Sequence, residues 1–229
     1  MRIMVVVVWM TAKLQIALDL LELTKAVEIA TRVVSAVKCD NIWIEVGTPL
    51  LKSWGKIAIK ALKNITDCFL VADTKIMDVP EIEGATVFGA GADAYTILAV
   101  ADDEVVKDGV RYAREKDKTV IIDLINHPNP LNRAVKLAEY GADVLLYHVG
   151  ISVQKARGIS AKDLKNEIAE LRKLVPVKIA VAGGLKPGDV RELVELGVDV
   201  VVVGGAVTKS PEPENVVKQL LMEIGYKLE

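Results

Sequence analysis

Eight short apolar runs, spaced about 25 residues apart, constrain the fold of this chain more than any other feature of its sequence. Each run is rich in Val, Ile and Leu and lacks the polar alternation of a half-exposed strand. Continuous apolar character over four to eight residues is typical of parallel strands that are covered on both faces. The runs span residues 14–19, 41–46, 68–73, 94–98, 119–124, 144–148, 177–182 and 200–204.

Segments with helical spacing of their apolar residues and with charged opposite faces separate these runs. Eight such β-α units fit a closed barrel of about 250 residues. The alternative is an open doubly wound sheet, which often carries a glycine-rich loop after its first strand. No glycine follows the first run, which continues as DLLE (19–22), so we predict an α/β fold, a single-domain (β/α)8 TIM barrel over residues 13–229. The predicted helices span residues 22–37, 51–65, 103–116, 131–140, 161–174, 189–196 and 214–224.

Residues 1–12 precede this predicted barrel and include the apolar run 3–10. A membrane-spanning helix needs about 20 apolar residues, so this run is too short to span a bilayer. The run could serve as the apolar region of a signal peptide, but TAK (11–13) is a poor cleavage site and cutting there would remove the chain up to the first strand. We expect an N-terminal extension of an intracellular protein, which could be an added strand, a partner contact or the product of an upstream start codon.

Composition excludes several classes of protein. A hydrophobic fraction of 52% is ample for a buried core and excludes a disordered chain. The 29 Lys and Arg residues nearly balance the 31 Asp and Glu residues, so the electrostatic footprint of a nucleic-acid binder is missing. Cys39 and Cys68 suggest neither a disulfide framework nor a zinc site, which suits a reducing cytoplasm.

Polar side chains follow five of the apolar runs at the point where each predicted strand ends. In a (β/α)8 barrel the catalytic groups lie on the loops after the carboxyl ends of the strands. A carboxylate inside an apolar strand must be paired, hydrogen-bonded or bound to a metal, so Glu45 and Asp123 are candidates for function. Asp19 could instead cap the next helix, and His148 could be a satisfied core histidine. The candidates are Asp19, Glu45, Asp73, Lys75, Asp78, Asp123, Asn126 and His148.

Two further patterns at strand ends indicate a charged ligand. The segment Asp73-x-Lys75-x-x-Asp78 places two carboxylates beside one ammonium, which keeps the lysine charged and gives a strong local field. The seventh and eighth runs end in the pairs Gly183-Gly184 and Gly204-Gly205. The loops after strands seven and eight of such barrels frequently bind phosphate through backbone N–H groups, and glycine allows that close approach. We therefore predict a phosphate site at these glycines.

Three segments carry a resemblance to a known family: LQIALD (14–19), IEVGTP (44–49) and ADTKIMD (72–78). They resemble the orotidine 5′-phosphate decarboxylase suprafamily, and within it the 3-hexulose-6-phosphate synthases, over nearly the whole chain from Leu14 onward. Orotidine 5′-phosphate decarboxylases carry a lysine in place of Glu45, and 3-keto-L-gulonate-6-phosphate decarboxylases carry an arginine in place of Gly150. Val79-Pro80 and Ser152 depart from the pattern of the synthases.

The resemblance implies an aldolase that depends on Mg²⁺ (or Mn²⁺) and interconverts ribulose 5-phosphate plus formaldehyde with D-arabino-3-hexulose 6-phosphate through an enediolate. It further implies a homodimer with shared active sites, because the aspartate at position 78 reaches the neighbouring subunit. From the cysteines, the charge balance and the short apolar run we expect a cytoplasmic protein with no nucleic-acid or membrane partner. The implied roles are metal binding by Glu45 and Asp73, catalysis by Lys75, His148, Asp78 and Asp19, substrate binding by Asp123 and Asn126, and phosphate binding by Gly183, Gly184, Gly204 and Gly205.

Other functions compete with this interpretation. Decarboxylation of 3-keto-L-gulonate 6-phosphate or of orotidine 5′-phosphate is the alternative within the same suprafamily. Lys75 could form a Schiff base, but flanking carboxylates raise the pKa of a lysine whereas Schiff-base chemistry needs that pKa lowered. A non-catalytic sensor of phosphate compounds is a third alternative, against which the full set of charged residues at the strand ends argues.

Overall fold

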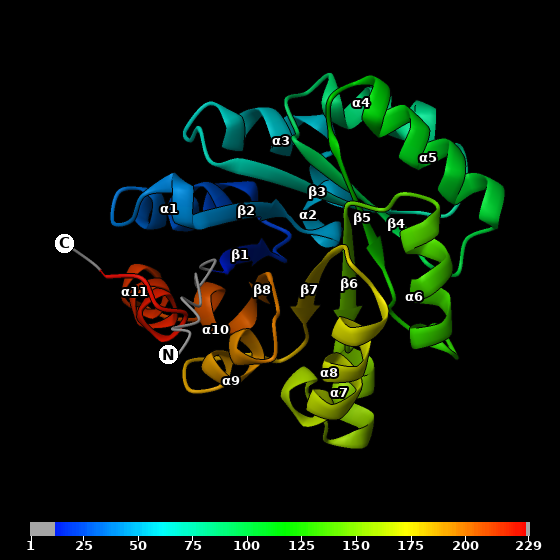
Figure 1. Ribbon diagram of the computed structural model, residues 1–229. Coiled ribbons are helices and arrows are strands. Elements are labelled where there is room, and N and C mark those ends of the chain that lie inside the picture. The colour runs from blue at the N-terminus through cyan, green and yellow to red at the C-terminus, as the bar shows by residue number, and fades with distance from the viewer. Residues whose placement is uncertain (1–11, 228–229) are drawn as a thin grey trace, which may run out of the picture.

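The computed structural model describes residues 12–227, which form a closed barrel of eight parallel strands in sequence order, surrounded by helices (Figure 1). The predicted (β/α)8 barrel is confirmed. The third strand extends three residues beyond its predicted end, and every other strand boundary lies within one residue of the prediction. The strands are β1 (Lys13–Leu18), β2 (Ile42–Val46), β3 (Phe69–Ile76), β4 (Ala94–Leu98), β5 (Thr119–Asp123), β6 (Val144–His148), β7 (Lys178–Ala182) and β8 (Val200–Val203).

The helices match the predicted segments, with one division and three additions. The predicted segment 51–65 is two helices, because Gly55 adopts a φ of 53° and breaks the first from the second. Three helices lie outside the predicted segments: α4 contains a glycine, and α7 and α10 are only seven and four residues long. The helices are α1 (Leu23–Val34), α2 (Thr48–Trp54), α3 (Lys56–Lys63), α4 (Pro80–Phe88), α5 (Asp103–Glu115), α6 (Pro130–Glu139), α7 (Ile151–Arg157), α8 (Lys165–Leu174), α9 (Val190–Glu195), α10 (Gly205–Thr208) and α11 (Pro213–Glu223), with 3-10 turns at Cys39–Asn41 and Ala161–Leu164.

Apolar side chains fill two layers on either side of the strands, as strands without polar alternation require. One layer lies between the barrel and the helices, and it includes Leu14 and Ile16 of β1. The other fills the barrel interior, where the rings of Trp43 and Phe69 pack with centroids 4.5 Å apart. Polar side chains at the mouth therefore rest on a rigid apolar base.

The first and last elements of the barrel are joined directly. β1 pairs with β8 in parallel register, and α1 packs against α11 outside them. Arg32 on α1 donates to the Glu214 carboxylate at 2.9 Å and to the backbone oxygen of Pro211. These contacts close the sheet without leaving an exposed edge strand.

The prediction of two separate cysteines is wrong. Cys39 and Cys68 form a disulfide with a Cα–Cα distance of 4.6 Å. They lie 29 residues apart in sequence, but Cys39 begins the 3-10 turn that leads into β2 and Cys68 directly precedes β3, the strand hydrogen-bonded to β2. Closure of the barrel therefore brings the amino ends of these neighbouring strands together, which spacing in the sequence did not reveal.

Three aspartates at the amino-terminal end of the barrel each connect a pair of neighbouring strands. Asp93, Asp143 and Asp199 directly precede β4, β6 and β8, and each carboxylate accepts the backbone N–H of a residue on the strand before it. Asp93 also pairs with the ammonium groups of Lys63 and Lys118 at 3.1 and 3.2 Å. Burial opposes ionisation of Asp93, but the hydrogen bond from Leu70 and the two lysines outweigh burial and lower its pKa.

The predicted N-terminal extension, residues 1–12, lies outside the described residues except for Ala12. Among residues 12–227, none of the helices combines the length and the apolar character that a bilayer crossing would need.

We expect Asp93→Asn to lower the free energy of unfolding by about 1–2 kcal/mol at pH 7, because the amide keeps an acceptor for the backbone N–H but loses both ion pairs. The lowered pKa of Asp93 stabilises the fold above the unfolded pKa of about 3.9 and loses this effect as pH falls through the folded value. Urea unfolding at pH 7 and pH 3 measures the difference, with the exposed Asp67→Asn as control. An equal loss of stability at both values of pH would contradict the ionic role.

Candidate active site

Six of the side chains that the sequence singled out come together at the carboxyl-terminal mouth of the barrel. Because successive side chains of a strand alternate between its two faces, a residue near a strand end projects either into the mouth or toward the helices. Direct contacts and electrostatic interactions connect the six, which come from five different strands or strand ends. They are Asp19, Glu45, Asp73, Lys75, Asp123 and His148.

The end of β3 supplies the central ion pair. The ammonium of Lys75 donates to both oxygens of Asp73, at 2.9 and 2.8 Å, and to the Asp123 carboxylate at 3.2 Å. The register between β3 and β4 shifts between Ala72 and Ile76, and Lys75 adopts a left-handed conformation with a φ of 51°. A bulge of this kind re-aims a side chain next to an active site. It allows Asp73 and Lys75, two residues apart, to meet each other.

Asp123 connects this ion pair to the histidine. Its carboxylate is fully buried and lies 3.0 Å from Nδ1 of His148, on the adjacent strand β6. Burial alone would raise the pKa of Asp123, but His148, Lys75 and the N–H of Ile125 outweigh burial and lower it. An ionised Asp123 fixes the ring through Nδ1, so Nε2 is the nitrogen left for a ligand.

Glu45 and Asp19 carry the surplus negative charge of the mouth. Burial, Asp73 and Asp19, in that order, raise the pKa of Glu45 well above its ordinary value. Lost hydration and the charge of Asp73 also raise the pKa of Asp19, although Lys75 and His148 oppose this. Asp19 does not cap the following helix, whose N-cap residue is Glu22, so the structural alternative for Asp19 is wrong.

The pKa of Lys75 is raised as well. Burial would lower it, but the charges of Asp73 and Asp123 outweigh burial. The ammonium is therefore held in its charged form, as the pattern Asp73-x-Lys75 predicted.

Three polar residues that the sequence analysis did not select hold the carboxylates in place. Thr48 and Thr96 donate hydroxyl hydrogen bonds to the two oxygens of Asp73, at 2.6 and 2.9 Å. Gln15 donates to the Glu45 carboxylate at 2.8 Å from inside the barrel. Gln15 and Thr96 each interrupt an apolar strand, and this interruption is the signal in the sequence that could have found them.

The carboxylates fit a cation that needs few protein ligands. Within residues 12–227, no three His, Cys, Asp or Glu side chains converge as a preformed metal cage. Mg²⁺ is usually held by one or two carboxylates together with waters and substrate oxygens. Glu45 and Asp73 are buried carboxylates whose charges oppose each other, and a divalent cation between them would relieve that repulsion.

The glycine pairs lie beside this cluster, at the ends of β7 and β8. Gly183 and Gly184 adopt φ values of 128° and 71°, which side chains rarely tolerate. Gly204 precedes α10, and a Cβ on it would lie 3.5 Å from a carboxylate oxygen of Asp19. The two loops therefore border the same mouth, where the phosphate site is predicted.

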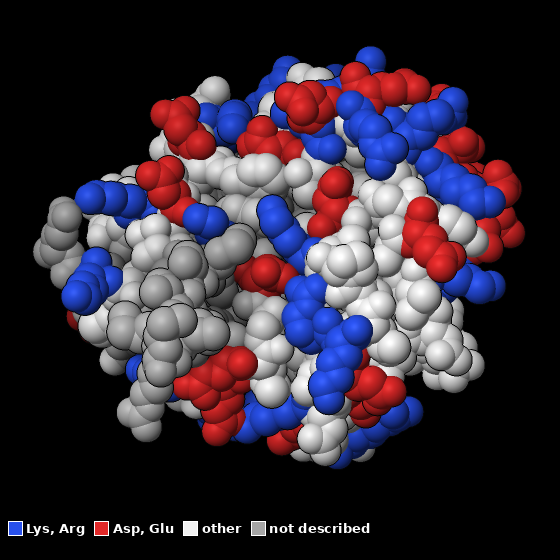
Figure 2. Space-filling model, viewed as in Figure 1, with Lys and Arg blue, Asp and Glu red and all other residues white. Residues whose placement is uncertain are grey.

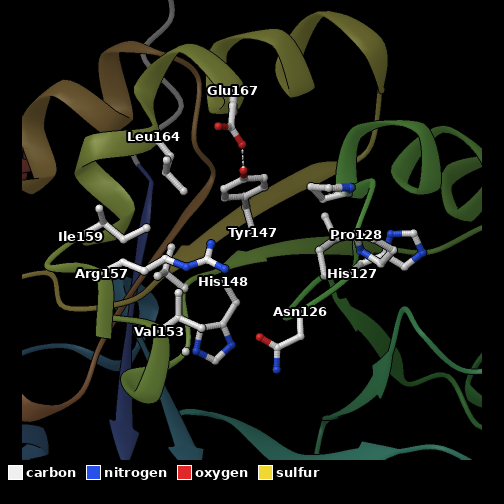
Figure 3. Close-up of a pocket in the computed structure, with 14 residues that line it drawn as sticks. Asn126, His127, Pro128, Tyr147, His148, Val153, Arg157, Ile159, Leu164 and Glu167 are labelled. Atoms are coloured by element: carbon white, nitrogen blue, oxygen red, sulfur yellow. Dashed lines mark hydrogen bonds between the residues drawn. The ribbon is translucent and has the colours of Figure 1, made fainter. Parts of the chain in front are cut away.

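Asn126 and His148 line one cavity of about 450 Å³ beside the carboxylate cluster (Figure 3). Gly150 lines the same cavity and contributes no side chain to it. At the outer end of the cavity Tyr147 donates a hydrogen bond to Glu167, the contact drawn as a dashed line. Asn126 has a left-handed φ of 58°, which turns the loop after β5 over the cavity.

Asp78 is the one candidate that lies apart from this cluster. Its side chain is exposed on the loop after β3 and accepts a hydrogen bond from the backbone N–H of Val79 at 2.8 Å. Val79 has a φ of 47°, an uncommon conformation for a β-branched residue. Over the face of the protein that Figure 2 draws, acidic and basic side chains are interspersed, in keeping with a formal net charge of −2.

Comparisons with known proteins identify the family to which the chain belongs. Residues 12–220 match the orotidine 5′-phosphate decarboxylase / HUMPS family. The 3-hexulose-6-phosphate synthase of Staphylococcus haemolyticus is 36% identical over 208 residues, which cover 90% of this chain and 96% of that protein. The crystal structure of 3-hexulose-6-phosphate synthase from Salmonella typhimurium is 37% identical with a TM-score of 0.84, covering 93% of this chain and 98% of the other.

A decarboxylase of the same fold is also similar. The 3-keto-L-gulonate-6-phosphate decarboxylase of Vibrio cholerae has a TM-score of 0.80 at 28% identity, covering 93% of this chain and 97% of the other. The resemblance found in the sequence is confirmed: this chain belongs to the orotidine 5′-phosphate decarboxylase / HUMPS family and is similar to 3-hexulose-6-phosphate synthases along nearly its whole length.

Proposed function

We propose that this chain is a Mg²⁺-dependent aldolase that interconverts ribulose 5-phosphate plus formaldehyde with D-arabino-3-hexulose 6-phosphate. The similarity to 3-hexulose-6-phosphate synthases supports the reaction. The surplus of carboxylates over cations at the mouth is the observation that carries the mechanism. Buried Glu45 lies close enough to Asp73 and Asp19 to raise its pKa, while Lys75 pairs with Asp73 and Asp123.

Glu45 and Asp73 would hold the cation. Both are buried at strand ends, and both are oriented by hydrogen bonds from neighbouring strands or loops. When bound there, Mg²⁺ supplies a Lewis acid that polarises substrate oxygens.

His148 is the proposed proton carrier. The imidazole takes the proton from C1 of ribulose 5-phosphate, which leaves an enediolate. C1 then forms a bond to the formaldehyde carbon, and the proton returns to the new alkoxide oxygen. Asp123 holds the ring through Nδ1 at 3.0 Å and stabilises its charged form between these steps.

Lys75 stabilises the negative charge that develops on the substrate oxygens. Its ammonium is fixed by Asp73 and Asp123 before substrate binds, so little reorganisation accompanies the reaction. The raised pKa of Lys75 argues against a Schiff base, which requires a neutral amine.

The remaining residues bind the substrate. Asp19 orients substrate hydroxyls beside Gly204, and Asn126 lines the cavity on the side of β5. The fully buried Asp123 supports the substrate site through its contacts with Lys75 and His148. The backbone N–H groups at Gly183, Gly184, Gly204 and Gly205 bind the phosphate, because a glycine has no side chain of its own to prevent close approach.

Decarboxylation is the alternative reaction for this site. Gly150 favours the aldolase, because the 3-keto-L-gulonate-6-phosphate decarboxylases that the sequence resembles carry an arginine there. Val79-Pro80 favours the decarboxylase, whose pattern it resembles. Assays for formaldehyde and for CO₂, run on the two substrates in parallel, distinguish the two reactions directly.

A second copy of this chain is the proposed partner. Exposed apolar side chains lie on the segments that follow β1, β2 and β3, the last of which carries Asp78, and Trp54 donates to the backbone oxygen of Leu21 between two of these segments. Such a patch marks an interaction surface. In this dimer Asp78 reaches the neighbouring site. The exposed residues are Leu21, Trp54, Ile57, Met77, Val79 and Ile82.

We place the protein in the cytoplasm, where a charged sugar phosphate is retained by the membrane. The Cys39–Cys68 disulfide is more typical of an oxidising compartment, although intracellular proteins of hyperthermophiles also carry disulfides. Nucleic acid and membrane are not proposed as partners, because a chain with a formal net charge of −2 lacks the excess of basic residues that attracts either of them.

We expect turnover of ribulose 5-phosphate and formaldehyde to require Mg²⁺ or Mn²⁺ and to stop in EDTA, because a divalent cation held by Glu45 and Asp73 would supply the Lewis acid that the reaction needs. Formaldehyde consumption with and without chelator measures this, and added Mg²⁺ restores activity as a control. Full turnover in EDTA, together with inactivation by borohydride plus substrate, would establish a Schiff base on Lys75 instead.

We expect Glu45→Gln to lower kcat by about 1000-fold, which corresponds to roughly 4 kcal/mol of lost transition-state stabilisation. The fold survives, because the neutral amide relieves the repulsion that raises the pKa of Glu45. Steady-state kinetics and thermal melting give both quantities, with the exposed Asp67→Asn as a matched control. Wild-type turnover of Glu45→Gln would refute the metal assignment.

Shared active sites predict complementation between two inactive variants. Asp78→Ala and Lys75→Ala are each expected to lose most activity alone. Mixed and refolded together, they regain about a quarter of wild-type turnover, because half of the dimers are mixed and each mixed dimer has one intact site. If the mixture stays as inactive as its components while sedimentation shows dimers, Asp78 does not act across the interface.

A further inference from the structure

Gln15 lies in the interior of the barrel, one layer below the carboxylates. It is 2% exposed and stands on β1 between Trp43 of β2 and Val202 of β8, which are its neighbours in register. Its side chain projects inward, as do those of Ala17 and Asp19 two and four residues further along the strand. Burying a polar side chain at this depth costs free energy unless its polar atoms are hydrogen-bonded, so packing alone does not explain a glutamine here.

Only half of the Gln15 amide is hydrogen-bonded. Nε2 donates to Oε2 of Glu45 at 2.8 Å, whereas Oε1 is buried and has no partner among the described residues. A buried acceptor without a partner costs about 1–3 kcal/mol. A leucine of similar size would avoid this cost, so Gln15 is not explained by stability alone.

The chemistry of the amide explains the choice of residue. A lysine or arginine in this place would also donate to Glu45, but its charge would neutralise the carboxylate. The neutral amide orients Glu45 and leaves the negative charge intact. The Gln15 amide donates to Oε2 of Glu45 only. No described residue donates to the other carboxylate oxygen, Oε1 of Glu45, so that oxygen is available to a cation.

We propose that Gln15 is a positioning residue that holds Glu45 in the orientation for binding a divalent cation. This inference rests on the proposed metal site at Glu45 and Asp73 and extends it to a residue without direct contact to the ion. Partners that orient metal ligands from behind contribute about 10–100-fold to metal affinity.

The test is Mg²⁺ binding by isothermal titration calorimetry, on metal-free protein without substrate, for the wild-type chain and for Gln15→Leu and Gln15→Met. We expect both variants to melt cooperatively and to bind Mg²⁺ about 10–100-fold more weakly than the wild type. Val202→Ala is the matched control, because Val202 is the register neighbour of Gln15 in the barrel interior and its apolar side chain cannot hydrogen-bond to Glu45. It lowers the melting temperature and leaves the Mg²⁺ affinity unchanged.

The outcomes separate the two proposals. Wild-type Mg²⁺ affinity in Gln15→Leu and Gln15→Met would overturn the role of Gln15 and leave the metal site standing. Loss of the folded state in both variants would also overturn it, because Gln15 would then serve the fold. No saturable Mg²⁺ binding by the wild-type chain would overturn the metal site and, with it, the role of Gln15.

Discussion

Repulsion among carboxylates at the mouth of the barrel is the constraint on which the rest of the site depends. Asp19, Glu45, Asp73 and Asp123 converge there, and Lys75 is the ammonium that pairs directly with two of them. Charge of one sign in a poorly hydrated site is costly unless a counter-charge is supplied. The raised pKa values of Asp19 and Glu45 are the electrostatic consequence, and a divalent cation is the simplest remedy.

Charged residues at the amino-terminal end of the barrel stabilise the fold, whereas those at the carboxyl-terminal end form the candidate active site. At the amino-terminal end, carboxylates such as Asp93 are satisfied by backbone N–H groups and lysines, so their charge stabilises the fold. At the carboxyl-terminal end the surplus charge is left for a ligand, and three of the four described non-glycine residues with a positive φ, Lys75, Val79 and Asn126, lie there. Strain of this kind persists where the surrounding structure fixes it, and it clusters at functional sites.

The sequence predicted the barrel well because its strands are buried on both faces, which makes each one a continuous apolar run. Glu45, Asp73 and Asp123 could be found for the same reason, since a carboxylate in such a run stands out. Contacts between neighbouring strands could not be predicted from the sequence. The Cys39–Cys68 disulfide and the Thr96–Asp73 hydrogen bond join residues 23 to 29 positions apart and exist only once neighbouring strands pair. The bulge that re-aims Lys75 left no mark in the pattern of apolar residues.

The central claim is that Glu45 and Asp73 together hold a divalent cation that contacts the sugar phosphate. The most direct measurement is anomalous diffraction from crystals grown with Mn²⁺ and ribulose 5-phosphate. The account predicts one strong peak at the barrel mouth within bonding distance of an oxygen of each carboxylate and of the sugar. Sugar phosphate bound at the mouth with no peak there, or with the peak bound to other residues, would contradict it.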